Sequence, residues 1–228
     1  MKAILRRAAT LSAFASLMLT ASPLVYGQQT QYALRTHEIE EARPAAERAL
    51  PVMLKLDSEL LGFGSLDEAS RATLGTPISV HYYWKRTLRD KRSADPEQLL
   101  AFEDEVVFPV EVGSETRSAI TMKKRNGFWN AAAFGGAEEA RAIDDIRKRH
   151  VGEKGRQLTG HFLVRAPEYY LLFVGHYDDQ NKLILASAFD DDQLGIKAGS
   201  EMPAEEVVSI LRREAPNLGG GPLTDPRR

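Results

Sequence analysis

Five histidines are the side chains of this sequence best suited to acid–base or metal chemistry, since the chain contains no cysteine. They lie at positions 37, 81, 150, 161 and 176, and no two are four residues apart, as helix-borne zinc ligands would be. His81 and His176 fall in stretches that alternate like β-strands and could meet on the open face of a sheet. With an acid such as Asp178 or Asp190, either would supply the general base of a hydrolase. The alternative is two solvent-facing strand histidines.

The signatures of common hydrolases are absent from the sequence. There is no Gly-x-Ser-x-Gly elbow and no Ser-x-x-Lys pair. His37-Glu38 begins like a zinc-protease motif, but position 41 is glutamate instead of the second histidine. These absences favour a protein that is not an enzyme and that needs no cofactor.

An acidic loop is the metal candidate that spacing alone suggests. Asp190, Asp192, Gly195 and Glu201 match positions one, three, six and twelve of a calcium-binding EF-hand loop. Position five is Leu194, which has no side-chain oxygen. Calcium binding by Asp190, Asp192 and Glu201 is therefore one interpretation, and a solvated acidic turn is the other.

Aromatic side chains on the expected strands offer a recognition surface. The candidates are Tyr83, Trp129, Tyr169 and Tyr170. Exposed aromatic patches mark sites where proteins bind one another, whereas strand aromatics that face inward belong to the core. The sequence leaves both interpretations open.

The first 27 residues have the order of charge, apolar core and small residues that is typical of a secretory signal peptide. Lys2, Arg6 and Arg7 precede an uncharged apolar stretch from Ala8 to Ala21, which is shorter than the ~20 residues of a membrane span. Cleavage is expected between Ala21 and Gln28. We therefore predict a periplasmic or secreted protein without a membrane anchor after cleavage.

Composition narrows the class of protein further. The absence of cysteine excludes disulfides, so about 200 mature residues must be stabilised by their core alone. Loss of the signal peptide takes the formal charge from −2 to −5. A mildly acidic chain whose densest basic cluster is Lys123-Lys124-Arg125 is not expected to bind nucleic acid.

Alternating apolar residues predict strands. They are expected at 77–85, 106–112, 116–124, 128–134, 162–165, 169–177 and 183–189. In the first, the side chains of Ile78 and Trp84 share the face predicted to be buried, and Tyr83 lies on the other. Pro109 predicts an edge position or a bulge, and Asn126-Gly127 predicts a two-residue hairpin turn.

Three- and four-residue spacings of apolar side chains predict the helices. One is expected at 37–61, with a break or a kink near Ala49-Leu50 because of the prolines at 44 and 51. A capping box opens a short helix at Ser65, a further helix covers 137–150, and the last begins near Pro203 with Ser200 as its cap.

Hairpin connections between these strands predict an α+β fold, an antiparallel sheet with helices packed on one face. The expected organisation is a signal peptide at 1–27, a flexible lead-in at 28–36, a single α+β domain at 37–215 and a disordered tail at 216–228. Neither a Rossmann nor a TIM-barrel pattern occurs.

A leading helix, the Leu74-Gly75-Thr76-Pro77-Ile78 entry to a strand, the Phe108-Pro109-Val110 strand and the Asn-Gly hairpin ending in Trp129 resemble uncharacterised exported bacterial proteins. Their shape is similar to cystatin-like and PepSY-type domains. That resemblance implies a non-catalytic module that binds or inhibits a protein or peptide partner. The competing hypothesis is an unfamiliar periplasmic hydrolase that uses His81 or His176.

Overall fold

The computed structural model describes residues 24–56, 59–91, 94–154 and 158–214, with the side chains of 24–38, 153 and 154 left out. Residues 1–23 of the predicted signal peptide and the predicted tail at 216–228 lie outside the described residues.

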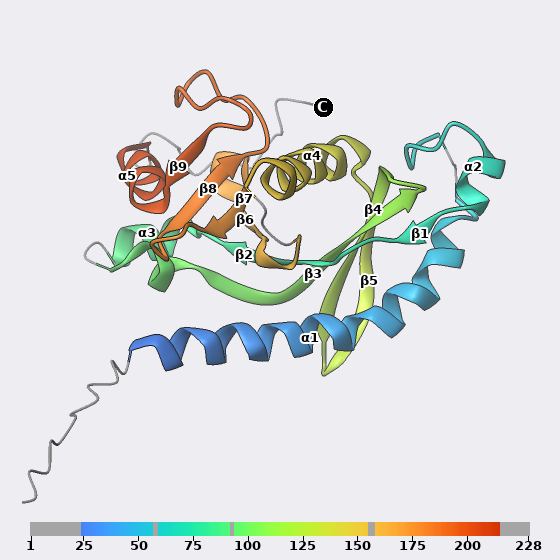
Figure 1. Cartoon of the computed structure of the whole chain (residues 1–228), viewed down its shortest axis with the longest axis horizontal. Coiled ribbons are helices and arrows are strands. Elements are labelled where there is room, and N and C mark those ends of the chain that lie inside the picture. The colour runs from blue at the N-terminus through green and yellow to red at the C-terminus, as the bar shows by residue number, and fades with distance from the viewer. Residues whose placement is uncertain (1–23, 57–58, 92–93, 155–157, 215–228) are drawn as a thin grey trace, which may run out of the picture.

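In the part of the chain that the structure describes, nine strands form one sheet, and helices lie above and below it in Figure 1. They are β1 Thr73–Leu74, β2 Ile78–Tyr82, β3 Ala101–Val112, β4 Glu115–Arg125, β5 Phe128–Gly135, β6 Phe162–Ala166, β7 Leu171–Tyr177, β8 Leu183–Ser187 and β9 Glu201–Pro203. The order is β5-β4-β3-β2-β6-β7-β8-β9, with β1 paired to β3. Every pair is antiparallel except β2–β6. This central parallel pair joins two antiparallel meanders.

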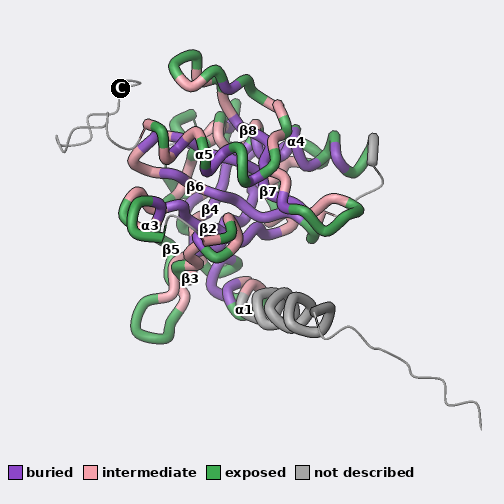
Figure 2. Tube along the Cα trace, turned by 90° about the vertical axis from the view of Figure 1, so that its left-hand side faces the viewer, coloured by how far each residue is buried: buried purple, intermediate pink, exposed green. Residues whose placement is uncertain are grey.

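The predicted α+β class and the mainly antiparallel sheet are confirmed, but packing on one face is too narrow a description. Helix α4, Ala137–Lys154, covers one face through Ile143 and Ile146. Helices α1, Leu24–Met53, and α5, Ala204–Glu214, cover the other. We call these the α4 face and the α1 face. Both faces carry buried apolar side chains, and Figure 2 shows that the buried residues, in purple, follow the strands at the centre of the molecule.

Helix α1 is longer at its start and shorter at its end than predicted. Residues 28–36, the expected lead-in, are helical, and the helix ends at Met53 rather than near residue 61. Pro44 and Pro51 lie inside it. Of the two alternatives predicted near Ala49-Leu50, the break does not occur, because the helix is continuous, and the helix bends toward its C-terminal end (Figure 1). Within the described residues, no helix combines the length and apolar character that crossing a membrane requires.

The remaining helical segments are short. They are α2 Leu66–Ser70, α3 Lys85–Asp90 and the 3₁₀ turns η1 Pro96–Leu99, η2 Leu158–Gly160 and η3 Pro167–Tyr169. The predicted cap at Ser65 is confirmed, because its side chain accepts from the Glu68 amide at 3.1 Å. The predicted cap at Ser200 is wrong: residues 201–203 form β9, and the Ser200 hydroxyl donates to the Lys197 carbonyl at 2.6 Å.

The hairpin turn predicted at Asn126-Gly127 is confirmed. Asn126 and Gly127 have φ angles of 53° and 81° and join β4 to β5, as a hairpin turn with two positive φ angles requires. The edge position suggested for Pro109 is wrong, because β3 lies between β2 and β4. The ladder irregularity of the alternative occurs nearby, between Val110 and Glu111.

The alternation predicted for the strand at 77–85 does not separate a buried face from an exposed one. All five residues of β2 are buried, because helices cover both sides of the sheet. Tyr83 is fully buried, and Trp84 precedes α3 instead of continuing the strand. The surface proposed on Tyr83 is therefore part of the core.

Two phenylalanines, one on β3 and one on β5, test this burial pattern. Phe108 is 0% exposed and Phe128 is 74% exposed. Replacing Phe108 with alanine should lower the free energy of unfolding by about 3–5 kcal/mol, whereas Phe128→Ala should change it by less than about 0.5 kcal/mol. Urea unfolding of both variants makes the comparison, and equal losses would contradict the assigned faces.

Candidate metal centre

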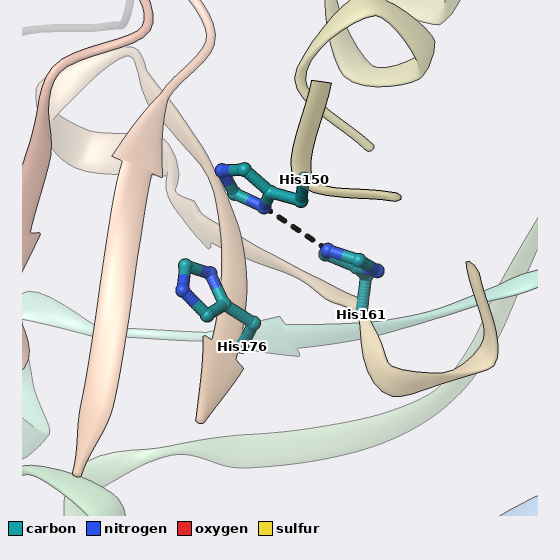
Figure 3. Close-up of side chains that lie close together, drawn as sticks. All are labelled: His150, His161 and His176. Atoms are coloured by element: carbon teal, nitrogen blue, oxygen red, sulfur yellow. Dashed lines mark hydrogen bonds between the residues drawn. The ribbon is translucent and has the colours of Figure 1, made fainter. Parts of the chain in front are cut away.

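Three histidines from separate elements converge on the α4 face. His150 comes from α4, His161 directly precedes β6, and His176 lies on β7; their rings point toward one another in Figure 3. One ring nitrogen from each lies within 4.8 Å of the others, and all three side chains are buried. Among the described residues this is the one cluster of three or more ligand-type side chains.

The packing of the sheet explains why these three positions meet. Phe162 pairs with Gly175 in the antiparallel β6–β7 ladder, so the preceding residue, His161, lies opposite His176. Along α4, His150 lies four residues after Ile146, which places it on the same buried stripe. The stripe that anchors the helix therefore ends over the two strand-borne histidines.

Hydrogen bonds on the outer side of two rings fix which nitrogens face inward. His150 Nε2 lies 2.8 Å from a Glu201 carboxylate oxygen, and His161 Nδ1 lies 3.3 Å from the Leu158 carbonyl. Protonation of these outer nitrogens leaves a lone pair on His150 Nδ1 and on His161 Nε2. Those two atoms are 3.0 Å apart (Figure 3). Two lone pairs at this distance require a proton or a cation between them.

His176 completes the cluster and has the least favourable environment without an ion. It is 2% exposed, and neither ring nitrogen has a hydrogen-bond partner among the described residues. Its ring centroid lies 4.5 Å from that of His150. A buried polar group without a partner costs about 1–3 kcal/mol. Coordination of a metal ion would satisfy one of its two ring nitrogens.

Arg147, one helical turn before His150, holds the turn that orients His161. It is 1% exposed and donates to the carbonyls of Thr76 at 3.2 Å and Leu158 at 3.0 Å. Burial lowers the pKa of Arg147 to about 10, so the side chain remains cationic at neutral pH. The Leu158 carbonyl thus accepts from both Arg147 and His161, which fixes the η2 turn.

The geometry fits a single first-row transition metal. Zinc bound by imidazoles has Zn–N distances of ~2.0–2.1 Å in a tetrahedral site, which places ligand nitrogens about 3.3 Å apart. Rotations of the three rings would bring the ligand nitrogens, two of which now lie 3.0 Å apart and all of which lie within 4.8 Å of one another, to that separation. The Glu201 carboxylate and the Leu158 carbonyl are the outer-shell acceptors that metal-binding histidines normally have.

A second buried polar cluster occupies the α4 face near the N-terminus of α4. The Glu105 carboxylate, 1% exposed, accepts from Tyr82 at 2.7 Å and Arg165 at 2.8 Å and pairs with Lys123 at 2.7 Å. Burial and the bond to Glu105 raise the pKa of the Tyr82 hydroxyl. Burial lowers the pKa of Arg165, but the carboxylates of Glu139 and Glu105 outweigh it and the pKa is raised. These charges satisfy one another within the cluster.

The predicted catalytic residues are not brought together. His81 pairs with Val164 across β2–β6 and lies on the α1 face, whereas His176 lies on the α4 face. The Asp178 carboxylate accepts from the amides of Gln180 and Lys182, both at 2.8 Å, and shapes the β7–β8 turn. No shared role of His81 and His176 follows from this arrangement.

The residues of the predicted calcium loop have other partners. Asp190 accepts from the Ala198 amide at 2.8 Å, and Asp192 forms an ion pair with Lys197 that lowers the pKa of the aspartate. Glu201 points to His150. Of the three candidates, only Glu201 adjoins the metal cluster, and it does so through a histidine.

The predicted aromatic surface is divided by the fold. Tyr83 and Tyr169 are buried, and the Tyr83 hydroxyl donates to the Pro96 carbonyl at 3.1 Å. Trp129 is half-buried beneath the Lys124 ammonium. Tyr170 is half-buried with a φ of 56° and lines a surface groove beside Arg165.

Spacing along the chain could not reveal His150 and His161 as members of this site. His150 lies at the end of the helix predicted over 137–150, and His161 lies just before the strand predicted at 162–165. The apolar stripe Ala140, Ile143, Ile146 did extend by four residues to His150, and this periodicity was the one available signal.

The different environments of His150 and His176 give a test on the metal-free protein. In the presence of a chelator, His176→Leu should leave the free energy of unfolding unchanged or raise it by about 1–2 kcal/mol, because it removes a buried polar group that has no hydrogen bond. His150→Leu should lower it by about 1–3 kcal/mol, because it deprives Glu201 and His161 of a partner. Urea unfolding provides both values, and a larger loss for His176→Leu would contradict this description.

No protein-family model, curated protein or solved structure matches the chain. The resemblance to cystatin-like and PepSY-type domains therefore stays a prediction. The function has to be inferred from the fold and from this site.

Proposed function

We propose that this chain is an exported protein that binds one divalent transition-metal ion, and that this ion is zinc. The ligands are His150 Nδ1, His161 Nε2 and one ring nitrogen of His176. The observation that carries the proposal is His176: a buried imidazole with no hydrogen-bond partner, beside two histidines whose outer nitrogens already have acceptors. A metal ion supplies the missing interaction for all three at once.

The type of ligand favours zinc or a neighbouring metal. Imidazole nitrogen suits zinc, copper, nickel and iron, whereas calcium and magnesium prefer oxygen. The nearest carboxylate, Glu201, contacts the nitrogen of His150 that faces away from the cluster. It therefore serves as the outer-shell partner that holds the ring.

Three protein ligands leave a fourth tetrahedral position for water or another small ligand, as in zinc sites that are not purely structural. Hydrolysis by the bound water would need an acid–base group beside that position. Glu201 is engaged on the far side of His150, so the proposal concerns binding of the ion rather than a reaction.

A ligand set made only of histidine suits the predicted compartment. Outside the cytoplasm, thiols are prone to disulfide formation and further oxidation. This chain has no cysteine, so its proposed ligands keep their metal affinity under oxidising conditions. Recognition of a protein or peptide partner stays a prediction, with Tyr83 and Tyr169 removed from it by burial.

Zinc titration of the full chain tests the proposal. Calorimetry or native mass spectrometry should show one zinc ion per chain. Each of His150→Ala, His161→Ala and His176→Ala should weaken binding by more than the ~10–100-fold typical of outer-shell substitutions. In the unsubstituted protein, free zinc at one hundred times the dissociation constant should add about 2.7 kcal/mol to the free energy of unfolding.

The double substitution Asp190→Asn/Asp192→Asn is the matched control, because it changes the acidic loop and leaves the histidines in place. Zinc binding should be unaffected in this variant. Unchanged zinc affinity in all three alanine variants, or loss in the acidic-loop control, would reject the proposed ligands.

The role assigned to Glu201 gives a separate expectation. Glu201→Gln keeps the size of the side chain but removes the charge that favours the Nε2-protonated form of His150. Zinc affinity should fall about 10–100-fold, while the stoichiometry remains one. Cobalt absorption in place of zinc would show whether the coordination geometry is kept, and complete loss of binding would make Glu201 a direct ligand.

A further inference from the structure

A second site lies on the α1 face, in a cavity of about 210 Å³ between α1 and the end of β2. Apolar atoms contribute most of the surface that lines it, although most of the lining residues are polar, and two of them, Glu40 and Arg43 of α1, form an ion pair at 3.3 Å. The other lining residues are Ile39 of α1, Thr76 and Pro77 before β2, Ser79 and His81 of β2, and residues 159–162, which include the proposed zinc ligand His161. A cavity of this size is large enough for a short acyl group and smaller than a typical drug-binding pocket.

Two buried polar side chains line this cavity and contact each other. The Ser79 hydroxyl lies 3.4 Å from His81 Nε2. Ser79 is 6% exposed and His81 is 1% exposed. A serine hydroxyl within reach of an imidazole nitrogen is the arrangement that activates serine as a nucleophile, and the contact is often long when no substrate is bound.

The surroundings hold the imidazole in place. The His81 ring packs against Phe102 at 5.5 Å and edge-on against Phe162 at 5.0 Å between ring centroids. The β2–β3 ladder shifts register between Ser79 and His81, opposite a segment in which Asp104 has a φ of 50°. Such irregularities re-aim side chains and are common beside active sites.

We propose that Ser79 is a nucleophile activated by His81 and that it accepts short, apolar acyl groups from esters. The Ser79 oxygen attacks the ester carbonyl carbon while its proton passes to His81 Nε2. The carbon–alkoxide bond then breaks, and His81 returns the proton to the departing alkoxide. Water attacks the acyl-serine in the same way, releases the carboxylic acid and restores Ser79.

The cavity borders the proposed metal centre, because His161 is among its lining residues. The reacting groups are nevertheless separate, since Ser79 and His81 lie on the α1 face of β2, whereas the three imidazoles converge on the α4 face. Because the acylation test is made in excess chelator, its outcome does not depend on metal binding.

4-Nitrophenyl butyrate is the probe, applied to the full chain in excess chelator. The expected result is release of 4-nitrophenol and a mass increase of one butyryl group, located on Ser79 by peptide mapping. Ser79→Ala should abolish the adduct. His81→Gln should slow its formation by about 10²–10⁴-fold, the usual contribution of a general base. Absence of an adduct at saturating probe, or an adduct on another residue, would overturn the proposal.

A control variant separates this chemistry from other sources of hydrolysis. Ser118→Ala changes a buried serine of β4 that does not line the cavity and should acylate at the unsubstituted rate. Loss of the reaction in this variant, with circular dichroism unchanged, would contradict the assignment to Ser79.

Access to Ser79 can be measured without relying on its reactivity, because the chain has no cysteine. Ser79→Cys introduces a single thiol into the cavity, and Ser118→Cys introduces one elsewhere in the core. Iodoacetamide should alkylate the first at least about ten times faster than the second under native conditions. Equal rates would show that the cavity does not admit small molecules and would reject the site.

Discussion

The packing of α4 across the parallel β2–β6 pair is the interaction on which the rest of the structure depends. The main-chain hydrogen bonds of this pair join the two meanders into one sheet. Helix α4 reinforces it by contacting β4 on one side and β7 on the other. Because Ile143 and Ile146 fix the helix against Leu163 and Val174, the position of every later residue of α4, including His150, is determined.

Two buried polar clusters lie near opposite ends of α4 on the same face of the sheet. Eighteen residues span about 27 Å, with the charged cluster around Glu105 near one end and the three histidines near the other. The partial negative charge at a helix C-terminus favours cations. The proposed metal position therefore agrees with the electrostatics of the backbone as well as with its ligands.

Patterns among residues close together in the sequence predicted much of the fold. The features that they missed depend on how strands distant in the sequence pair with one another. The Asn126-Gly127 hairpin and the stripe of α4 depend on neighbouring residues and are confirmed. The meeting of His161 with His176 depends on how β6 pairs with β7, which spacing along the chain does not encode. For the same reason, the sequence could not show that His81 and His176 lie on opposite faces.

The cross-strand placement of His161 and His176 has a consequence for folding. A slip of one residue between β6 and β7 would turn every side chain of the moved strand to the opposite face and carry His161 away from His150. An ion that needs all three imidazoles would then bind only the correctly paired chain. In the metal-binding protein that we propose, capture of the ion would therefore favour molecules with the native strand alignment over misaligned ones.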